Sequence, residues 1–185
     1  MPRGVDDARS DQELIRALNA GDASAFDALY WRYRDWCLRL AYRFTRDHDD
    51  ALDALQESFA YVARKFPGFV LTASMTTFLY PVVKNSALAV RRKRRRLVTG
   101  SDETIAVPSV EATGSENPRD ALAQVLAGIP DPSREVLLMR FVDGLKLHEI
   151  AAALGVPVGT VKSRLHNALA TLRADERMRR YFEVE

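Results

Sequence analysis

Residues 147–169 read LHEIAAALGVPVGTVKSRLHNAL, in which a glycine separates two short stretches of helical apolar spacing. Ala151, Gly155 and Val161 fall four and then six residues apart, as expected where two short helices cross around a tight turn. The small side chain of Ala151 allows close approach of the second helix, and Gly155 tolerates a positive φ. The apolar seam comprises Ile150, Leu154, Val156, Val161 and Leu165. This stretch predicts a helix-turn-helix.

The second helix of this motif carries polar and basic side chains opposite the seam, and none is acidic. They are Gly159, Thr160, Lys162, Ser163, His166 and Asn167. Residues of this kind near a helix N-terminus suit major-groove and phosphate contacts. A plain helical hairpin would share the apolar spacing, but it would not require this face. We therefore interpret the stretch as a DNA-reading element.

Charge is unevenly distributed along the chain, although a net charge of +2 over 185 residues is too small to indicate nucleic acid by itself. Residues 91–96 form an unbroken basic run, and residues 99–120 are acidic and rich in Gly, Ser, Thr and Pro. We interpret the acidic stretch as a flexible linker. It separates two predicted helical domains, residues 10–98 and 121–180, so the expected fold is all-α.

Four helices are predicted in the first domain. They are a capped helix from Ser10 to Asn19, a longer one from Asp22 through Phe44, a third over Asp47–Lys65, and a fourth from near Ser74 into the basic run. Pro81 is anomalous within the fourth, because proline removes a backbone hydrogen bond and clashes with the preceding turn. The helix should therefore either kink at Pro81 or begin later.

Several function classes find no support in the sequence. Cys37 is the only cysteine, which excludes an intrachain disulfide and suits a cytoplasmic protein, and its place on an apolar stripe predicts burial. His148-Glu149 begins like a zinc-protease motif, but Ala152 stands where the second histidine is needed. We expect no catalytic residue, metal or cofactor. No apolar run approaches the ~20 residues of a membrane span, and no signal-peptide core is present, so we expect no membrane insertion.

Acidic side chains cluster at the start of the third predicted helix, where Asp50, Asp53 and Glu57 share one side at i, i+3 and i+7. One interpretation is a solvated helix start favoured by the macrodipole. The other is a protein-binding face. The spacing leaves both open.

The basic run also has several interpretations: a solvated surface, a nuclear-import patch or a track for phosphates. Nearby aromatic residues could stack on unpaired bases or belong to the core. They are Phe66, Phe69, Phe78 and Tyr80.

Taken together, these residues resemble the extracytoplasmic-function (ECF) sigma factors, the small two-domain initiation subunits of bacterial RNA polymerase. FDALYWRYRDWCLRLAYRFTRDHDDALDALQESF is similar to the first two conserved helices of their domain two, and TTFLYPVVKNSALAVRRKRRR to the helix that opens and reads the minus-ten element. IPDPSREVLLMRFVDGLKLHEIAAALGVPVGTVKSRLHNALATL resembles domain four, which reads the minus-thirty-five element.

The resemblance implies three sets of site residues. Asp50, Asp53, Gln56 and Glu57 would face the clamp helices of core RNA polymerase. Asn85 and the basic run, including Arg91, Arg92 and Arg95, would lie near the minus-ten element, with the loop from Pro67 to Ser74 close to an unstacked base. Thr160, Lys162, Ser163, Arg164, His166 and Asn167 would meet the minus-thirty-five element. The implied partners are core RNA polymerase, promoter DNA and an anti-sigma factor.

This sequence departs from the family pattern at several positions. Leu52 replaces a usual acidic residue, Phe78 a common tryptophan, and Asn167 a frequent arginine. Lys146 stands where a hydroxyl side chain often caps the first helix of the motif, a loss of about 1 kcal/mol. We expect an unusual promoter preference.

The alternative function is a helix-turn-helix regulator that acts without polymerase and binds symmetric sites as a dimer. It explains neither the acidic helix face nor the linker. An adaptor that only sequesters a partner protein would leave the basic run and GTVKSRL unexplained.

Overall fold

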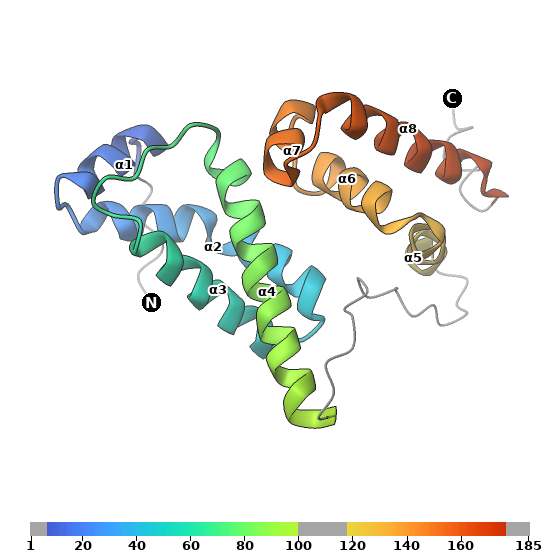
Figure 1. The fold of residues 1–185 in the computed structure, drawn as a ribbon, viewed down its shortest axis with the longest axis horizontal. Helices are drawn as coiled ribbons and strands as arrows, with labels where there is room; N and C mark the ends of the chain where they lie inside the picture. Colours follow the sequence, from blue (N-terminus) through green and yellow to red (C-terminus); the bar gives the residue numbers. More distant parts are fainter. Residues whose placement is uncertain (1–6, 100–117, 177–185) are drawn as a thin grey trace. The chain divides into compact units, whose positions relative to one another are not determined.

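The computed structural model describes residues 7–99 and 118–176, and every regular element within these ranges is an α-helix. The helices are α1 (Asp11–Asn19), α2 (Ser24–Thr45), α3 (His48–Ala63), α4 (Met75–Thr99), α5 (Pro118–Gly128), α6 (Asp131–Phe141), α7 (Leu147–Leu154) and α8 (Val158–Ala174), as drawn in Figure 1. They form two compact units, α1 to α4 and α5 to α8. The predicted all-α fold is confirmed.

The predicted boundaries of the two domains and of the linker stay predictions. Residues 100–117 and 177–180 lie outside the described residues. The described ranges place Thr99 in α4 and begin α5 at Pro118. Among residues 7–99 and 118–176, no helix combines the length and the apolar character that a membrane span requires.

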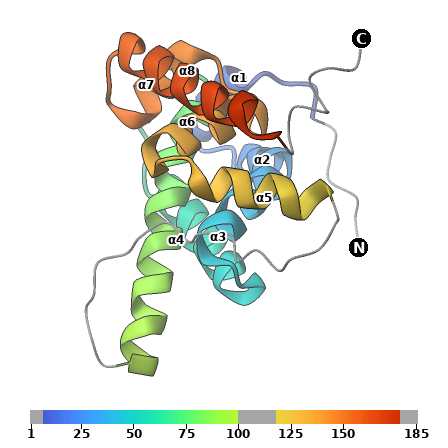
Figure 2. The same cartoon turned by 90° about the vertical axis from the view of Figure 1, so that its right-hand side faces the viewer.

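The first unit is a bundle in which α2, α3 and α4 pack against one another and α1 packs against α2. Cys37 is fully buried in this core, as predicted, and burial raises the pKa of its thiol to about 12. The buried aliphatic residues include Leu29, Leu40, Leu55, Val62, Leu79 and Val83. Figure 2 shows that the C-terminal turns of α4 extend past α2 and α3. The end of α4 is therefore exposed on several sides.

Side-chain caps set the starts of three helices in this unit. The predicted capping box at α1 is present, since the backbone N–H of Ser10 donates to the Glu13 carboxylate at 2.6 Å. The Asp47 carboxylate accepts the backbone N–H groups of Asp49 and Asp50, both at 3.0 Å, which starts α3. At α4, the Ser74 hydroxyl accepts the backbone N–H of Thr77 at 3.3 Å. Each cap satisfies N–H groups that have no partner within the helix.

α4 begins where the sequence pattern predicted, next to Ser74, and Pro81 lies inside it. The alternative of a later start is therefore wrong. Pro81 falls in the second turn of the helix, and its side chain borders a surface cavity.

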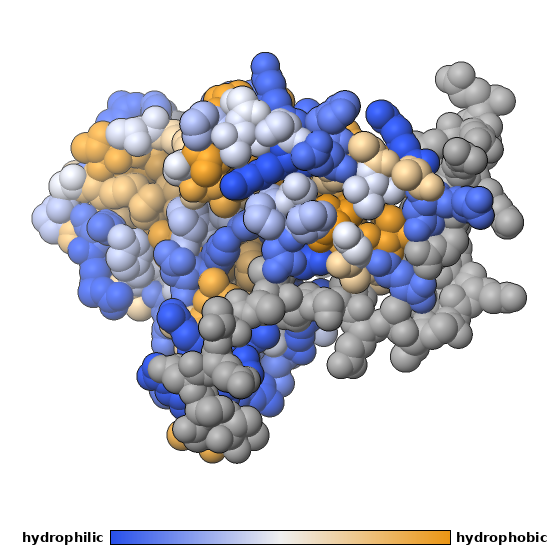
Figure 3. All heavy atoms as spheres, turned by 45° about the vertical axis from the view of Figure 1, so that its right-hand side comes forward, coloured by the Kyte–Doolittle hydropathy of each residue, from blue (hydrophilic) through white to orange (hydrophobic). Residues whose placement is uncertain are grey.

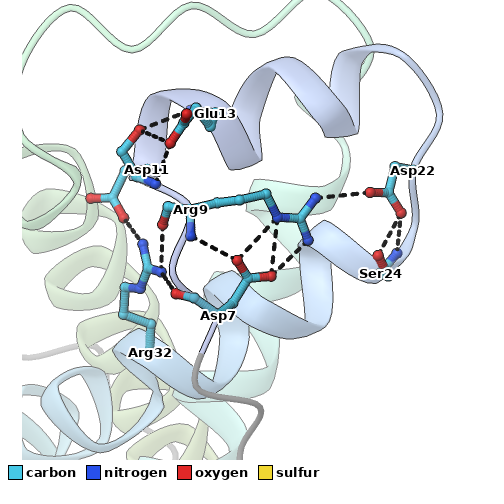
Figure 4. A network of polar contacts seen from close by, with 8 residues as sticks. Asp7, Arg9, Asp11, Glu13, Asp22, Ser24 and Arg32 are labelled. Carbon is cyan, nitrogen blue, oxygen red and sulfur yellow. Dashed lines mark hydrogen bonds and ion pairs between the residues drawn. The ribbon is translucent and has the colours of Figure 1, made fainter.

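A network of ion pairs fixes residues 7–10 and α1 onto α2, as Figure 4 shows. Arg32 of α2 pairs with Asp11 at 2.7 Å and also donates to the carbonyl oxygens of Asp7 and Arg9, both at 2.7 Å. Arg9 in turn joins Asp7 and Asp22, at 2.7 and 3.0 Å. The hydrogen bonds from Arg9 lower the pKa of Asp7 to about 2. The start of α1 is thus held at several points.

The second unit has its own core, built from α5, α6 and α8. One cluster of its buried residues comprises Val125, Ile129, Leu137, Ala168 and Leu172. Arg134 is buried beside this core, where its guanidinium donates to the carbonyl oxygens of Leu126 and Ala127 at the end of α5. An ion pair with Asp131 offsets the cost of burying this charge. Arg134 therefore joins the end of α5 to α6.

Candidate nucleic-acid and protein interfaces

Four residues of α3 form the face that we call the acidic face: Asp50, Asp53, Gln56 and Glu57. Asp53, Gln56 and Glu57 are exposed, so these three are available to a partner. The side chain of Asp50 is only 14 % exposed, because it pairs with Arg94 of α4 at 2.9 Å. The structure thus brings the four predicted residues onto one helix but gives Asp50 a partner within the bundle.

Arg94 also pairs with Asp47, the cap of α3, at 2.6 Å. The Asp47 carboxylate accepts hydrogen bonds from Arg94 and from the backbone N–H of Asp50. These bonds, the one from Arg94 above all, hold its pKa below the usual value. The two carboxylates in turn raise the pKa of Arg94. This bridge fastens the basic end of α4 to the beginning of α3.

The basic end of α4 presents its arginines in different directions. Arg92 and Lys93 are exposed, whereas Arg91 and Arg95 are half-buried. Arg91 donates to the carbonyl oxygen of Phe44 at 3.4 Å, and burial lowers its pKa. In Figure 3 hydrophilic side chains are visible on both sides of the protruding end of α4, and Leu97 is an exposed apolar residue there. A track for phosphates along this end would therefore use only part of the run.

A cavity of about 630 Å³ lies between α3 and α4. Asn85, which is exposed, stands on its wall together with the aromatic side chains of Tyr61 and Phe78. The full lining is Glu57, Ala60, Tyr61, Arg64, Phe78, Pro81, Val82, Asn85 and Ser86. Flat rings beside an amide are the groups that hold an unpaired base by stacking and by hydrogen bonds to its edge.

The aromatic residues named from the sequence divide between this cavity and the core. Tyr80 is 0 % exposed, so the suggestion that it could stack on a base is wrong; it lies on the core side of α4. Phe78 lines the cavity and contacts Phe69, with ring centroids 4.7 Å apart. Phe69 contacts Phe66 at 5.5 Å. These three rings connect the loop before α4 to the cavity wall.

The helix-turn-helix has the predicted turn. Gly155 ends α7 with φ of 65°, a left-handed conformation that glycine adopts without steric cost. Ile150 and Val161 are fully buried beneath the crossing, and Ala151 is 7 % exposed. The turn therefore sets α8 against α7 through the predicted apolar seam.

The opposite side of α8 is open to solvent. Lys162, Ser163, His166 and Asn167 are exposed, while Thr160 and Arg164 are half-buried at its margins. The Ser163 hydroxyl donates to the carbonyl oxygen of Thr160 at 3.0 Å, and its oxygen can still accept. We call these six residues the α8 face.

Lys146 supplies no side-chain cap for α7, as its side chain predicts. Glu149 compensates in part, because its carboxylate accepts the backbone N–H of Lys146 at 2.7 Å. The first helix of the motif thus keeps one half of a capping box.

Sequence reasoning missed three features. The first is the bridge from Arg94 to Asp47 and Asp50. The second is Asn19, which bonds to the loop before α4. The third is an apolar groove of about 290 Å³ in the second unit, bordered by the exposed side chains of Leu122, Phe141 and Val142. Exposed apolar residues at the end of REVLLMRFVDG were a signal for the groove.

The chain matches two family models, the sigma-70 region 2 model at residues 29–97 and the sigma-70 region 4 model at residues 119–172. It is 33 % identical over 164 residues to the ECF RNA polymerase sigma factor SigM of Mycobacterium tuberculosis, covering 89 % of this chain and 83 % of the relative. The chain belongs to the ECF RNA polymerase sigma factors. Sigma factors are transcription initiation factors, so this one binds core RNA polymerase and directs promoter-specific initiation in bacteria.

Other relatives agree with this assignment. The RNA polymerase sigma-H factor of Pseudomonas aeruginosa is 31 % identical over 172 residues, covering 85 % of this sigma factor and 89 % of the relative. In the solved structure of CnrH in complex with the cytosolic domain of CnrY, the matching chain shares 24 % identity at a TM-score of 0.65, with 89 % of this chain and 95 % of that chain covered. This last likeness concerns the fold.

Proposed function

We propose that this sigma factor uses three surfaces to bind polymerase, the opened minus-ten strand and the minus-thirty-five element. The acidic face of α3 binds core RNA polymerase. The cavity between α3 and α4, with the basic end of α4, holds the opened minus-ten strand. The α8 face reads the minus-thirty-five element in the major groove. The observation that carries this proposal is the placement of exposed charges of opposite sign on neighbouring helices of one bundle, Asp53 on α3 and Arg92 and Lys93 at the end of α4.

Electrostatics supports the assignment of α3 and α4 to different partners. DNA is a polyanion, so exposed carboxylates repel it and arginines attract it. Asp53 is exposed on α3 and is not part of the cavity lining, whereas Glu57 also borders the cavity; Arg92 and Lys93 are exposed on α4. A surface of each sign suits one protein partner and one nucleic-acid partner.

Strand opening would follow from binding energy alone. An unpaired base in the cavity would stack on Tyr61 or Phe78 and present its edge to Asn85. Base stacking on an aromatic side chain contributes about 1 to 3 kcal/mol, which offsets the cost of unpairing. This role needs no catalytic group, so we propose that the protein is not an enzyme and requires no cofactor. It would act in the cytoplasm, where the chromosome is transcribed.

An anti-sigma factor is the third proposed partner. One solved structure of similar fold contains the sigma factor RpoE in complex with the anti-sigma factor NepR from Bartonella quintana, at a TM-score of 0.59 and 21 % identity over 82 % of this chain. In another, CnrH is in complex with the cytosolic domain of CnrY. Binding of this kind would block access to polymerase.

Charge reversal on the acidic face tests the polymerase contact. Asp53→Arg is the preferred variant, because Asp53 is exposed, whereas substitution of Asp50 would also break the bridge to Arg94. We expect its affinity for core RNA polymerase to fall about tenfold or more. Asp35→Arg on α2 is the matched control and should bind normally, because the native side chain is 72 % exposed and its pair with the adjacent Arg34 lies at the surface, where such a pair contributes little. Equal binding by both variants would remove α3 from the interface.

A further inference from the structure

Asn19, the last residue of α1, bonds to a loop about fifty residues away in the sequence. Its side-chain oxygen accepts the backbone N–H groups of Gly68 at 2.7 Å and Phe69 at 3.1 Å. Its side-chain nitrogen donates to the carbonyl oxygen of Phe69 at 2.8 Å. The amide thus engages both peptide groups of one loop residue, which requires a donor and an acceptor on the same short side chain.

Asn19 stands at the end of a firmly held helix. Arg32 and Tyr33 of α2 both bond to the Asp11 carboxylate, at 2.7 and 2.5 Å, and the capping box closes the start of α1. Figure 4 shows the contact of Arg32 with Asp11 and the position of Glu13 at the start of α1. In Figure 1 the connection between α3 and α4 runs past α1. The helix can therefore act as a fixed support for the loop.

The loop in turn supports the cavity between α3 and α4. The ring of Phe69 lies 4.7 Å from the ring of Phe78, centroid to centroid. Phe78 lines the cavity together with Tyr61 and Asn85. Asn19 fixes the backbone of Phe69, Phe69 supports Phe78, and Phe78 forms part of the cavity wall.

We propose that Asn19 is a positioning residue for promoter opening, which holds Phe69 and Phe78 in the arrangement that accepts an unpaired base. The inference rests on the proposed function of the cavity. Asn19 itself would touch no base. Without its three bonds, the loop would leave this arrangement for part of the time. The affinity for the opened strand would then fall in proportion to the population of molecules that keep the arrangement.

Holoenzyme assembled from core RNA polymerase and the full chain provides the test. The probes are a promoter fragment selected by run-off transcription and a single-stranded oligonucleotide with its non-template minus-ten sequence. For Asn19→Ala we expect about tenfold weaker single-strand binding and a matching loss of permanganate-reactive thymines, with unchanged affinity for core polymerase. Asn19→Gln keeps both polar groups on a longer side chain. Its single-strand binding and promoter opening should be intermediate between those of the native chain and of Asn19→Ala.

Gln12→Ala is the matched control, because Gln12 is an exposed residue of α1 outside both the cap and the loop bonds. It should open promoters as well as the native chain. Normal opening by Asn19→Ala, or an equal defect in Gln12→Ala, would overturn the proposal. If the native holoenzyme itself neither bound the single strand nor opened the fragment, the proposed function of the cavity would be wrong, and the role of Asn19 that rests on it would be wrong too.

Discussion

Arg94 connects two surfaces that the proposed function assigns to different partners, the basic end of α4 and the acidic face of α3. It belongs to the basic run expected near DNA, yet it bonds to Asp50 of the acidic face and to Asp47 beneath it. Arg94 and Asp47 are 51 % and 32 % exposed, so their bridge contributes modestly to stability and responds to salt. Its pH dependence follows from Asp47, whose carboxyl is stabilised in the ionised form.

Arg94→Gln should lower the midpoint of urea unfolding of the first unit slightly at neutral pH. A carboxyl group whose pKa is lower in the folded state than in the unfolded state stabilises the fold at any pH above the unfolded-state pKa, about 4 for aspartate. This stabilisation is lost as the pH falls through the folded-state pKa. The difference between the native chain and the variant should therefore shrink below about pH 4. Arg92→Gln, which removes a side chain bonded to the carbonyl of Leu88, should show no such pH dependence. A difference that persisted at low pH would rule out the ion pair as its cause.

Gly155 is the residue on which the crossing of α7 and α8 depends. No heavy atom outside its neighbours lies within 4 Å of a Cβ built there, so only the backbone opposes substitution. Gly155→Ala should destabilise the second unit by about 1 to 2 kcal/mol, and Gly155→Asn by less, since asparagine tolerates the left-handed region better. Amide hydrogen exchange in α8 measures the loss. Equal protection in all three proteins would contradict this account of the turn.

At the scale of elements, α8 combines a buried side that fixes its position with a solvent side that carries polar groups. Val161 and Ala168 are fully buried. Lys162 offers a point charge, and Asn167 offers the paired donor and acceptor that recognise adenine. The two residues should therefore contribute differently to binding.

Lys162→Ala should weaken holoenzyme binding to all promoters alike and reduce the salt dependence by about one ion. Asn167→Ala should instead relax the preference at one base pair, at a cost of about 1 to 3 kcal/mol on the preferred sequence. Binding to a library of minus-thirty-five sequences at several salt concentrations separates the two effects. If Asn167→Ala weakened binding to all sequences equally, Asn167 would contact the DNA backbone and not a base.

Much of this architecture follows from local sequence patterns. Apolar spacing and caps predict α1, α3 and the α7–α8 turn, because each rests on residues within a few positions of one another. The bonds from Asn19 to the loop and from Arg94 to Asp50 join residues 44 to 50 positions apart, and no local pattern encodes them. Periodicity also left Tyr80 ambiguous, since an aromatic side chain on α4 suits either the core or the cavity.

At the scale of the whole molecule, each unit has its own core and its own proposed surface for DNA. The first unit also carries the acidic face of α3, the proposed surface for polymerase. This organisation explains why a small chain carries both an acidic helix and two basic ones. It also predicts that the free protein binds promoter duplex weakly, because high affinity requires both units to be held on polymerase.

Run-off transcription on fragmented genomic DNA, with and without this sigma factor, tests the central claim most directly. Core polymerase with the chain should yield discrete transcripts that are absent without it, and the free chain should bind the same fragments only weakly. Tight, sequence-specific binding by the free chain, with transcripts unchanged by its addition, would contradict the account and favour a regulator that acts without polymerase.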